Sequence, residues 1–172
     1  MKLLRNKLFL IGLVCTAPFV LGTMAYLFDW GTGAGANYGD LIPPRALAAS
    51  ALQPLRGRWV LVSFDAPACD AHCEKKLYFM RQVRRAQGQN MERVERLWVL
   101  TGAGEPRPEL LAAIEGTRIL KNQDVKSFEA HAVDHVYLVD PLGNLMMRFP
   151  RDPDPGRMIK DLQRLLKYAR SG

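Results

Sequence analysis

Residues 58–73, RWVLVSFDAPACDAHC, decide the fold. The first seven, residues 58–64, form a short apolar run rich in β-branched and aromatic side chains, which predicts a buried strand. A loop with a proline follows, and residues 74–87 then place apolar side chains at helical spacing. Cys69 and Cys73 therefore fall between a strand and the start of its helix.

The same two patterns continue toward the C-terminus. Short apolar runs predict further strands at residues 94–101, 135–140 and 145–149, and helical spacing predicts helices at residues 108–115 and 155–169. The segment 141–144, PLGN, is a strong turn signal that makes the last two strands a hairpin. The order β, α, β, α, β, β, α predicts an α/β domain over residues 55–172, with a thioredoxin-like mixed sheet flanked by helices.

The N-terminus has the pattern of a membrane anchor. Residues 1–7 carry three bases, and residues 8–28 form 21 consecutive positions without a charge. A span of about 20 apolar residues can cross a bilayer as a helix. Bases before the span and none soon after it predict a cytoplasmic N-terminus. We therefore expect a single-pass protein of the cytoplasmic (inner) membrane, with its C-terminal domain in the periplasm.

A cleaved signal peptide is the alternative to a retained anchor. Its apolar region would be shorter, and the small residues Ala34-Gly35-Ala36 keep cleavage possible. We expect the domain to be exported in either case. Residues 29–54 are rich in glycine and proline with little apolar periodicity, and we expect them to be a flexible tether.

The net charge of +7 allows two readings. Many bases lie between residues 75 and 96, and most fit the solvated side of a helix and its following loop. A docking surface for an acidic protein partner is the other interpretation. Aromatic residues are not interleaved with these bases and no nucleic-acid motif is present, so we exclude nucleic acid as a partner.

Cys69 and Cys73 are the sharpest chemical signal. In an exported domain, two cysteines this close can form a disulfide or bind a metal. A thiol at the start of a helix meets the positive end of the helix dipole, which favours the thiolate. The thiolate is both the nucleophile of disulfide exchange and a soft metal ligand. A purely structural disulfide is a further reading, although so short a loop constrains the unfolded chain little.

His135 is the second signal. It opens the strand before the turn, and in a thioredoxin-like layout the loop before this strand lies beside the loop that carries the cysteines. Two thiolates and one imidazole make a three-coordinate soft site that suits Cu(I) and can hold Cu(II). We therefore predict a metal site of Cys69, Cys73 and His135.

Together these features resemble the Sco/SenC family of cytochrome oxidase assembly proteins. The resemblance rests on the anchor, the strand ending in Ser63-Phe64, the C-x3-C motif and the run 133–144, VDHVYLVDPLGN. It implies a thioredoxin-like fold and one copper held by Cys69, Cys73 and His135. It further implies a monomeric domain that serves the dinuclear copper site of cytochrome c oxidase subunit II, or another copper-site protein.

The chain also departs from that family. Asp70 and Glu74 stand where the family often or usually has proline, and the segment between Thr101 and His135 is shorter than expected. The resemblance therefore indicates a divergent, compact member.

Other candidate side chains carry weaker expectations. His72 could ligate or tune the thiols, although solvent exposure is the simpler reading, and His131 fits a loop. Asp134 could hold the His135 ring as an outer hydrogen-bond partner or could cap a turn. Three sulfur-bearing residues are better explained by the membrane span or by packing: Cys15, Met146 and Met147.

Three functions follow from this site. The first is a copper chaperone that uses all three predicted ligands. The second is a membrane-anchored thiol–disulfide oxidoreductase in which Cys69 attacks and Cys73 resolves. The spacing of the cysteines and the absence of proline before the later strand argue against it. The third is an anchored protein whose disulfide is only structural.

Overall fold

The structure is a computed structural model that describes residues 7–27, 37–46, 50–121 and 134–168. The chain divides into two compact units, residues 1–36 and 37–172. Each unit is described by itself.

The first unit contains one described helix, α1 (Lys7–Leu27), with Pro18 in its interior. Its bounds lie one residue before the expected span of 8–28. Over the part of the chain that the structure describes, no helix combines the length and apolarity needed to cross a membrane. The membrane anchor therefore stays a prediction.

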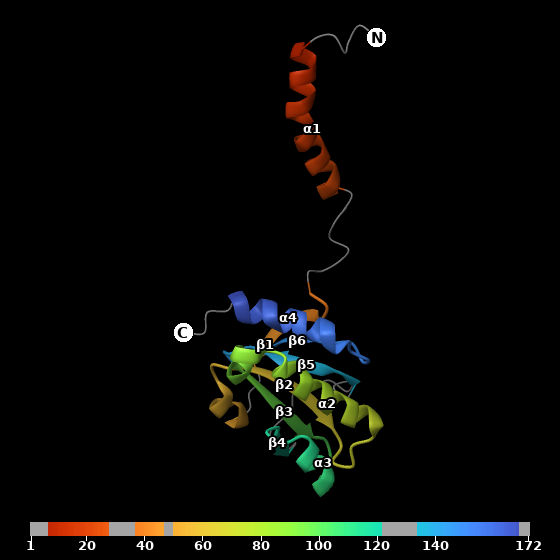
Figure 1. Cartoon of the computed structure of the whole chain (residues 1–172), viewed down its shortest axis with the longest axis vertical. Coiled ribbons are helices and arrows are strands. Elements are labelled where there is room, and N and C mark those ends of the chain that lie inside the picture. The colour runs from red at the N-terminus through yellow and green to blue at the C-terminus, as the bar shows by residue number, and fades with distance from the viewer. Residues whose placement is uncertain (1–6, 28–36, 47–49, 122–133, 169–172) are drawn as a thin grey trace. The chain divides into compact units, whose positions relative to one another are not determined.

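The second unit is built on a six-stranded sheet in the order β1-β6-β5-β2-β3-β4 (Figure 1). Its strands are β1 (Asp40–Ala46), β2 (Trp59–Asp65), β3 (Val94–Leu100), β4 (Arg118–Lys121), β5 (Val136–Val139) and β6 (Asn144–Arg148). β3 is parallel to both β2 and β4. The other three pairings are antiparallel, so the sheet is mixed, as predicted.

The helices complete the predicted order. They are α2 (Ala71–Arg85), α3 (Pro108–Ala113) and α4 (Pro155–Tyr168), with short 3-10 helices η2 (Ser50–Leu55) and η3 (Gly88–Arg93). α2 packs against α4 and against strands β2 and β3. Each predicted strand and helix of the domain is present, with ends that differ by a few residues.

Two apolar cores lie on opposite faces of the sheet. Successive side chains of a strand point to opposite faces. In β2, Trp59 and Leu61 join the core that α2 and α4 cover, whereas Val60 and Val62 join the other core with Leu55 of η2. Both cysteines belong to the first core. The chemistry of the molecule therefore sits at the edge of its larger core.

The segment expected to be a tether is partly folded. We expected no regular structure between residues 29 and 54, yet β1 pairs with β6 as an edge strand and η2 follows it. Pro43 and Pro44 were part of the composition from which a flexible tether was predicted. An edge strand tolerates proline, and the pairing register shifts at this point, between Leu41 and Arg45.

Asp161 of α4 fixes the start of this segment. Its side chain accepts hydrogen bonds from the backbone N–H groups of Tyr38 and Gly39, at 2.8 and 2.9 Å. The carboxyl is only 4% exposed. A Cβ on Gly39 would lie 2.6 Å from Met147 Sδ, so the backbone passes too close to the core for a larger residue. The folded domain therefore begins near residue 37.

β4 is the other element that the sequence did not predict. It has four residues, RILK, at the far edge of the sheet, and its burial pattern is largely exposed. So short and exposed a strand has no apolar alternation long enough to stand out.

Candidate functional site

Cys69 and Cys73 form a disulfide, with their Cα atoms 5.2 Å apart. Their side chains are 3% and 1% exposed. The loop after β2 carries Cys69, and the first turn of α2 carries Cys73. The structure thus brings together the two sulfurs that the sequence singled out, and it holds them in the oxidised state.

The loop turns sharply at Cys69. Its φ of 37° lies in the left-handed region, which residues other than glycine seldom adopt. The Cys69 N–H donates to the Ala66 carbonyl at 3.0 Å, which closes a tight turn after β2. This turn and the disulfide together hold the first cysteine against the start of α2.

Asp70 caps α2 at its N-terminus. Its side chain accepts a hydrogen bond from the Cys73 N–H at 2.9 Å, and its backbone is extended as a cap requires. This hydrogen bond is the main reason that the pKa of the Asp70 carboxyl is lowered from its ordinary value. The residue that replaces a family proline therefore starts the helix that carries Cys73.

Glu74, the second departure from the family, has a structural partner. Its carboxylate pairs with Arg107, which precedes α3. Arg107 also donates to the Cys69 carbonyl at 3.3 Å. The guanidinium therefore ties the cysteine loop, α2 and the segment before α3 to one another. The sequence offered no signal for this contact.

A buried polar group lies at the end of β2, just before the cysteine loop. Lys76 Nζ lies 2.9 Å from Asp65 Oδ1, and Ser63 Oγ donates to Asp65 Oδ2 at 2.6 Å. The side chains of Lys76 and Asp65 are 1% and 9% exposed. Burial raises the pKa of Asp65, and the hydrogen bonds from Ser63 and Lys76 oppose that shift.

We expected most bases between residues 75 and 96 to be solvated, but Lys76 is buried. It lies in the same row of α2 as Cys73, Leu77 and Met80, so it faces the core. A lysine in an apolar row at helical spacing was the available signal, together with an aspartate directly after an apolar strand.

His72 lies between the two cysteines and is half-buried. Its Nε2 is buried and has no hydrogen-bond partner among the described residues. The interaction of the ring with Asp65 opposes the net rise of that carboxyl's pKa, and its interaction with Asp70 adds to the lowering of the Asp70 pKa. The simpler expectation, a solvent-exposed histidine, is therefore only partly met.

His135 lies at the same end of the sheet as the cysteine loop. β5 is antiparallel to β2, with Val136 opposite Ser63, so the residue before Val136 reaches the end where β2 passes into that loop. The ring is half-buried, and its Nδ1 lies 2.8 Å from the Phe149 carbonyl oxygen. A carbonyl only accepts, so Nδ1 carries the proton. Nε2 then has the free lone pair that a metal requires.

The structure does not gather the three predicted ligands into a metal site. No three histidine, cysteine, aspartate or glutamate side chains come together as one within residues 7–27, 37–46, 50–121 and 134–168. The disulfide also occupies both sulfurs.

The remaining candidate side chains are Asp134, His131 and Cys15. Asp134 pairs with Arg151 at 3.4 Å, and the His135 Nδ1 turns to Phe149 instead. His131 lies outside the described residues. Cys15 is free and exposed on α1.

The two methionines of β6 alternate as expected. Met147 is fully buried in the core, and Met146 is half-buried. Packing therefore accounts for Met147.

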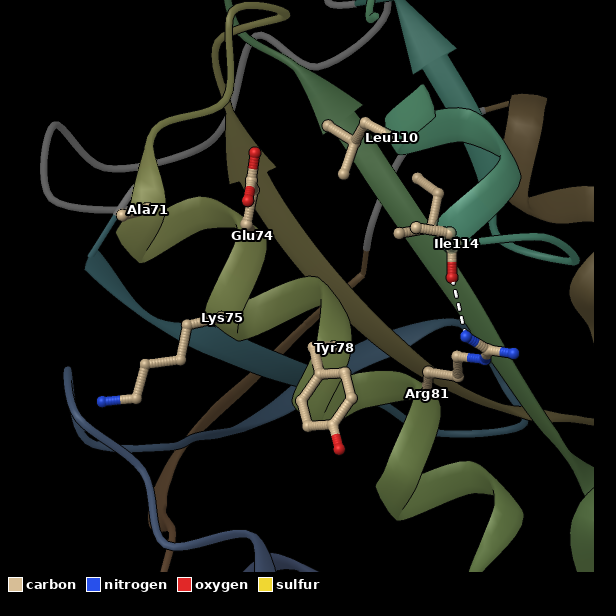
Figure 2. Close-up of a pocket in the computed structure, with 8 residues that line it drawn as sticks. Ala71, Glu74, Lys75, Tyr78, Arg81, Leu110 and Ile114 are labelled. Atoms are coloured by element: carbon tan, nitrogen blue, oxygen red, sulfur yellow. Dashed lines mark hydrogen bonds between the residues drawn. The ribbon is translucent and has the colours of Figure 1, made fainter. Parts of the chain in front are cut away.

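A groove separates α2 from α3 beside this site (Figure 2). Its volume is about 380 Å³, and its lining comes from Ala71, Glu74, Lys75, Tyr78, Arg81, Leu110, Ala113 and Ile114. Ala71 and Glu74 flank Cys73, so one end of the groove adjoins the disulfide. At the other end, Arg81 donates to the Ala113 carbonyl at 2.9 Å.

The mixed sheet and the disulfide at the start of α2 define a class, the thioredoxin-like proteins with a paired-cysteine site. A family profile described as "transmembrane-like, thioredoxin-like, C-terminal domain" matches residues 59–169, and the chain belongs to that family. The predicted thioredoxin-like fold is therefore confirmed. No curated protein matches the sequence.

Solved structures of Sco proteins share the fold. Bradyrhizobium japonicum ScoI with copper bound has a TM-score of 0.52 at 18% identity and covers 73% of this chain and 99% of its own. Yeast Sco1 with copper bound scores 0.54 at 14% identity, with coverage of 79% and 96%. A SCO1/SenC family lipoprotein from Bacillus anthracis scores 0.50 at 15% identity, with coverage of 74% and 95%. The resemblance to Sco/SenC proteins thus holds at the level of the fold.

Proposed function

We propose that this protein is a copper-handling assembly factor for the dinuclear copper site of cytochrome c oxidase subunit II. One copper ion, as Cu(I) or Cu(II), is its cargo. After reduction of the disulfide, Cys69 and Cys73 supply two sulfur ligands, and His135 supplies Nε2.

The hydrogen bond at His135 is the observation that carries this proposal. Metal-binding histidines commonly donate their other ring N–H to a carbonyl or carboxylate, which fixes the tautomer. The contact between His135 Nδ1 and the Phe149 carbonyl has this form. The antiparallel pairing of β2 and β5 puts this ring at the end of the sheet from which the cysteine loop leaves. Copper in two structures of the same fold adds support.

Copper binding by the two cysteines requires a reductant that first opens their disulfide. Opening the Cys69–Cys73 disulfide takes two electrons and two protons, which a dithiol protein of the same compartment can supply while its own thiols become a disulfide. Copper then displaces the thiol protons, because the thiolate is the ligand. Ligand exchange with the partner's cysteines passes the ion on without net turnover.

Thiol–disulfide exchange with the partner is the second candidate. The observation that favours it is the formed disulfide at the N-terminus of a helix. In this reading, the reduced domain transfers two electrons to the partner's disulfide and returns to the oxidised state. His135 would not take part.

The location of the domain rests on the sequence. We propose that the apolar residues 8–28 anchor it in the cytoplasmic membrane, with the folded part in the periplasm. The 21 uncharged positions and the bases before them support this. Protease added to intact spheroplasts should then digest the folded part, and membrane fractions should retain the full chain.

Metal analysis tests the copper proposal. Full-length protein is reduced, loaded with Cu(I) and desalted, and its copper content is compared with that of His135→Ala, Cys69→Ser and Cys73→Ser. We expect one copper per chain in the wild type, no retained copper in the cysteine variants and weakened retention in His135→Ala. His72→Ala is the matched control and should retain one copper. Full retention by both cysteine variants would overturn the proposal.

A trapping experiment separates the two candidates. Cys73→Ser cannot resolve a mixed disulfide, so an exchange enzyme should accumulate covalently bound partner. The same variant of a pure chaperone should trap none. His135→Ala combined with Cys73→Ser should trap as well as Cys73→Ser alone if exchange is the function.

A further inference from the structure

The groove between α2 and α3 leads away from the disulfide over an apolar floor. Leu110 of α3 and Ile114, which directly follows α3, are 8% and 4% exposed at its base. Tyr78 of α2 is 54% exposed and stands at the centre of the lining (Figure 2). A large ring with an apolar face and a polar tip, left open beside a cleft, is typical of a surface that binds another polypeptide.

Four arginines lie close to one another, and one of them, Arg81, lines the far end of the groove. They are Arg81, Arg84 and Arg85 of α2 and Arg96 of β3. Burial, and then the charges of its three neighbours, lower the pKa of Arg96 to about 10. Arg96 is only 3% exposed, and its Nε and Nη1 have no hydrogen-bond partner among the described residues.

Backbone carbonyls accept the hydrogen bonds of this cluster. Arg81, Arg84 and Arg96 each donate to a backbone carbonyl, those of Ala113, Val94 and Glu115. Within the described residues, no ion pair joins any of the four arginines to an acid. Glu95, whose charge acts on Arg96, forms its ion pair with Arg58, and Glu74 of the groove lining pairs with Arg107. We expected most bases between residues 75 and 96 to be solvated, but Arg96 is buried.

We infer that this groove docks an acidic, extended segment of the partner protein whose cysteines react at Cys69–Cys73. The inference rests on the proposed function, since it names the partner of the same site. The apolar floor takes one side chain of the segment, and Arg81 and Arg85 of the cluster take its carboxylates. A second copy of this chain is a poor occupant, because its own net charge is positive.

The geometry also sets a spacing. A helix rises about 1.5 Å per residue, so Arg81 and Arg85 lie about 12 and 18 Å along α2 from Cys73. An extended chain advances about 3.3 Å per residue. Successive side chains of an extended chain point to opposite faces, so the acids that face Arg81 and Arg85 stand about four and six residues from the partner's reacting cysteine.

The test uses full-length protein and labelled peptides. The probe has two glutamates, four and six residues from a serine in place of cysteine, with a leucine between the serine and the first glutamate. Matched peptides carry lysines in place of the glutamates, or the glutamates next to the serine. Fluorescence anisotropy at low salt measures binding. Two exposed charge contacts predict about five- to tenfold tighter binding of the spaced glutamate peptide than of either control.

Variants of the protein locate the binding. Arg81→Ala with Arg85→Ala should remove the preference, and Arg81→Lys with Arg85→Lys should keep most of it if the fold is intact. Lys160→Ala with Lys167→Ala removes the same charge from α4 and should bind as the wild type does. Tyr78→Ser should weaken all three peptides about equally.

Three outcomes would overturn the inference: equal binding of the glutamate and lysine peptides, an equal loss in the α4 variant, or binding of vesicles with anionic headgroups that excludes the peptide. Copper retention is measured on the same variants and should not change. If wild-type protein retains no copper but prefers the spaced peptide, the proposed function fails and the docking site stands. The reverse pattern removes only the docking site.

Discussion

Lys76 and Arg96 are charged side chains that the fold buries, at 1% and 3% exposed. Both belong to the basic stretch of residues 75–96, most of which fits a solvated face. Lys76 instead faces Asp65 within the core, and Arg96 lies beneath the turn that follows α3, with its Nη2 3.2 Å from the place of a Cβ on Gly116. Burial of a charge depends on a partner far away in the chain, which periodicity alone does not reveal.

Removing one partner of the buried pair should be costly. We expect Lys76→Met to lower the free energy of unfolding by about 3 kcal/mol, because it leaves the Asp65 carboxylate buried without its counter-charge. Lys75→Met removes an exposed ion pair with Asp152 and should change the free energy of unfolding by less than about 0.5 kcal/mol. Urea unfolding measures both. Similar losses in the two variants would contradict the account of the pair.

Titration of Asp65 and of Asp70 should change the free energy of unfolding in opposite directions as pH rises. The raised pKa of Asp65 means that its contribution is complete below its ordinary value of 3.8 and is lost as pH rises through the folded-state pKa. The lowered pKa of Asp70 means that its contribution is present above 3.8 and is lost as pH falls through the folded-state pKa.

Asparagine at each position provides the check. Asp70→Asn keeps a capping side chain and removes the titration, so it should flatten the acid side of the stability profile. Asp65→Asn should reduce the loss of stability as pH rises above 3.8. Unfolding by urea across this pH range measures both profiles. Unaltered slopes in either variant would show that the titration belongs to another group.

At the scale of the elements, the strand, cysteine loop and helix at residues 58–85 were predictable from the sequence. A continuous apolar run, a proline-containing loop and helical spacing all indicated the same arrangement. β1 was not predictable, since its two prolines and exposed side chains have the composition of a linker. Its place is set by β6 and by the carboxylate of Asp161, and both lie far away in the chain, after residue 143.

The hydrogen bonds that the Asp161 carboxylate accepts give a prediction for the segment that contains β1. Asp161→Ala leaves the buried N–H of Gly39 and that of Tyr38 without an acceptor, which should cost about 2 kcal/mol. Hydrogen exchange at residues 40–46 should rise far more than exchange in β2. Asp152→Ala, an exposed acid, is the control and should alter neither. Unchanged exchange in β1 would mean that strand pairing alone holds it.

For the whole molecule, the order of elements predicted the class of fold, and the fold explains why His135 reaches the cysteine end of the sheet. β5 runs antiparallel to β2, so the start of one strand meets the end of the other. What the order could not give is the state of the site. Whether two sulfurs bind each other or a metal is decided by redox chemistry, which the chain does not encode.

X-ray absorption at the copper edge of the reduced, Cu(I)-loaded, full-length protein tests the central claim most directly. We expect two sulfur neighbours and one nitrogen neighbour, with the nitrogen lost in His135→Ala and kept in His72→Ala. A spectrum with sulfur neighbours only, identical in wild type and His135→Ala, would contradict the claim that His135 shares a copper site with Cys69 and Cys73.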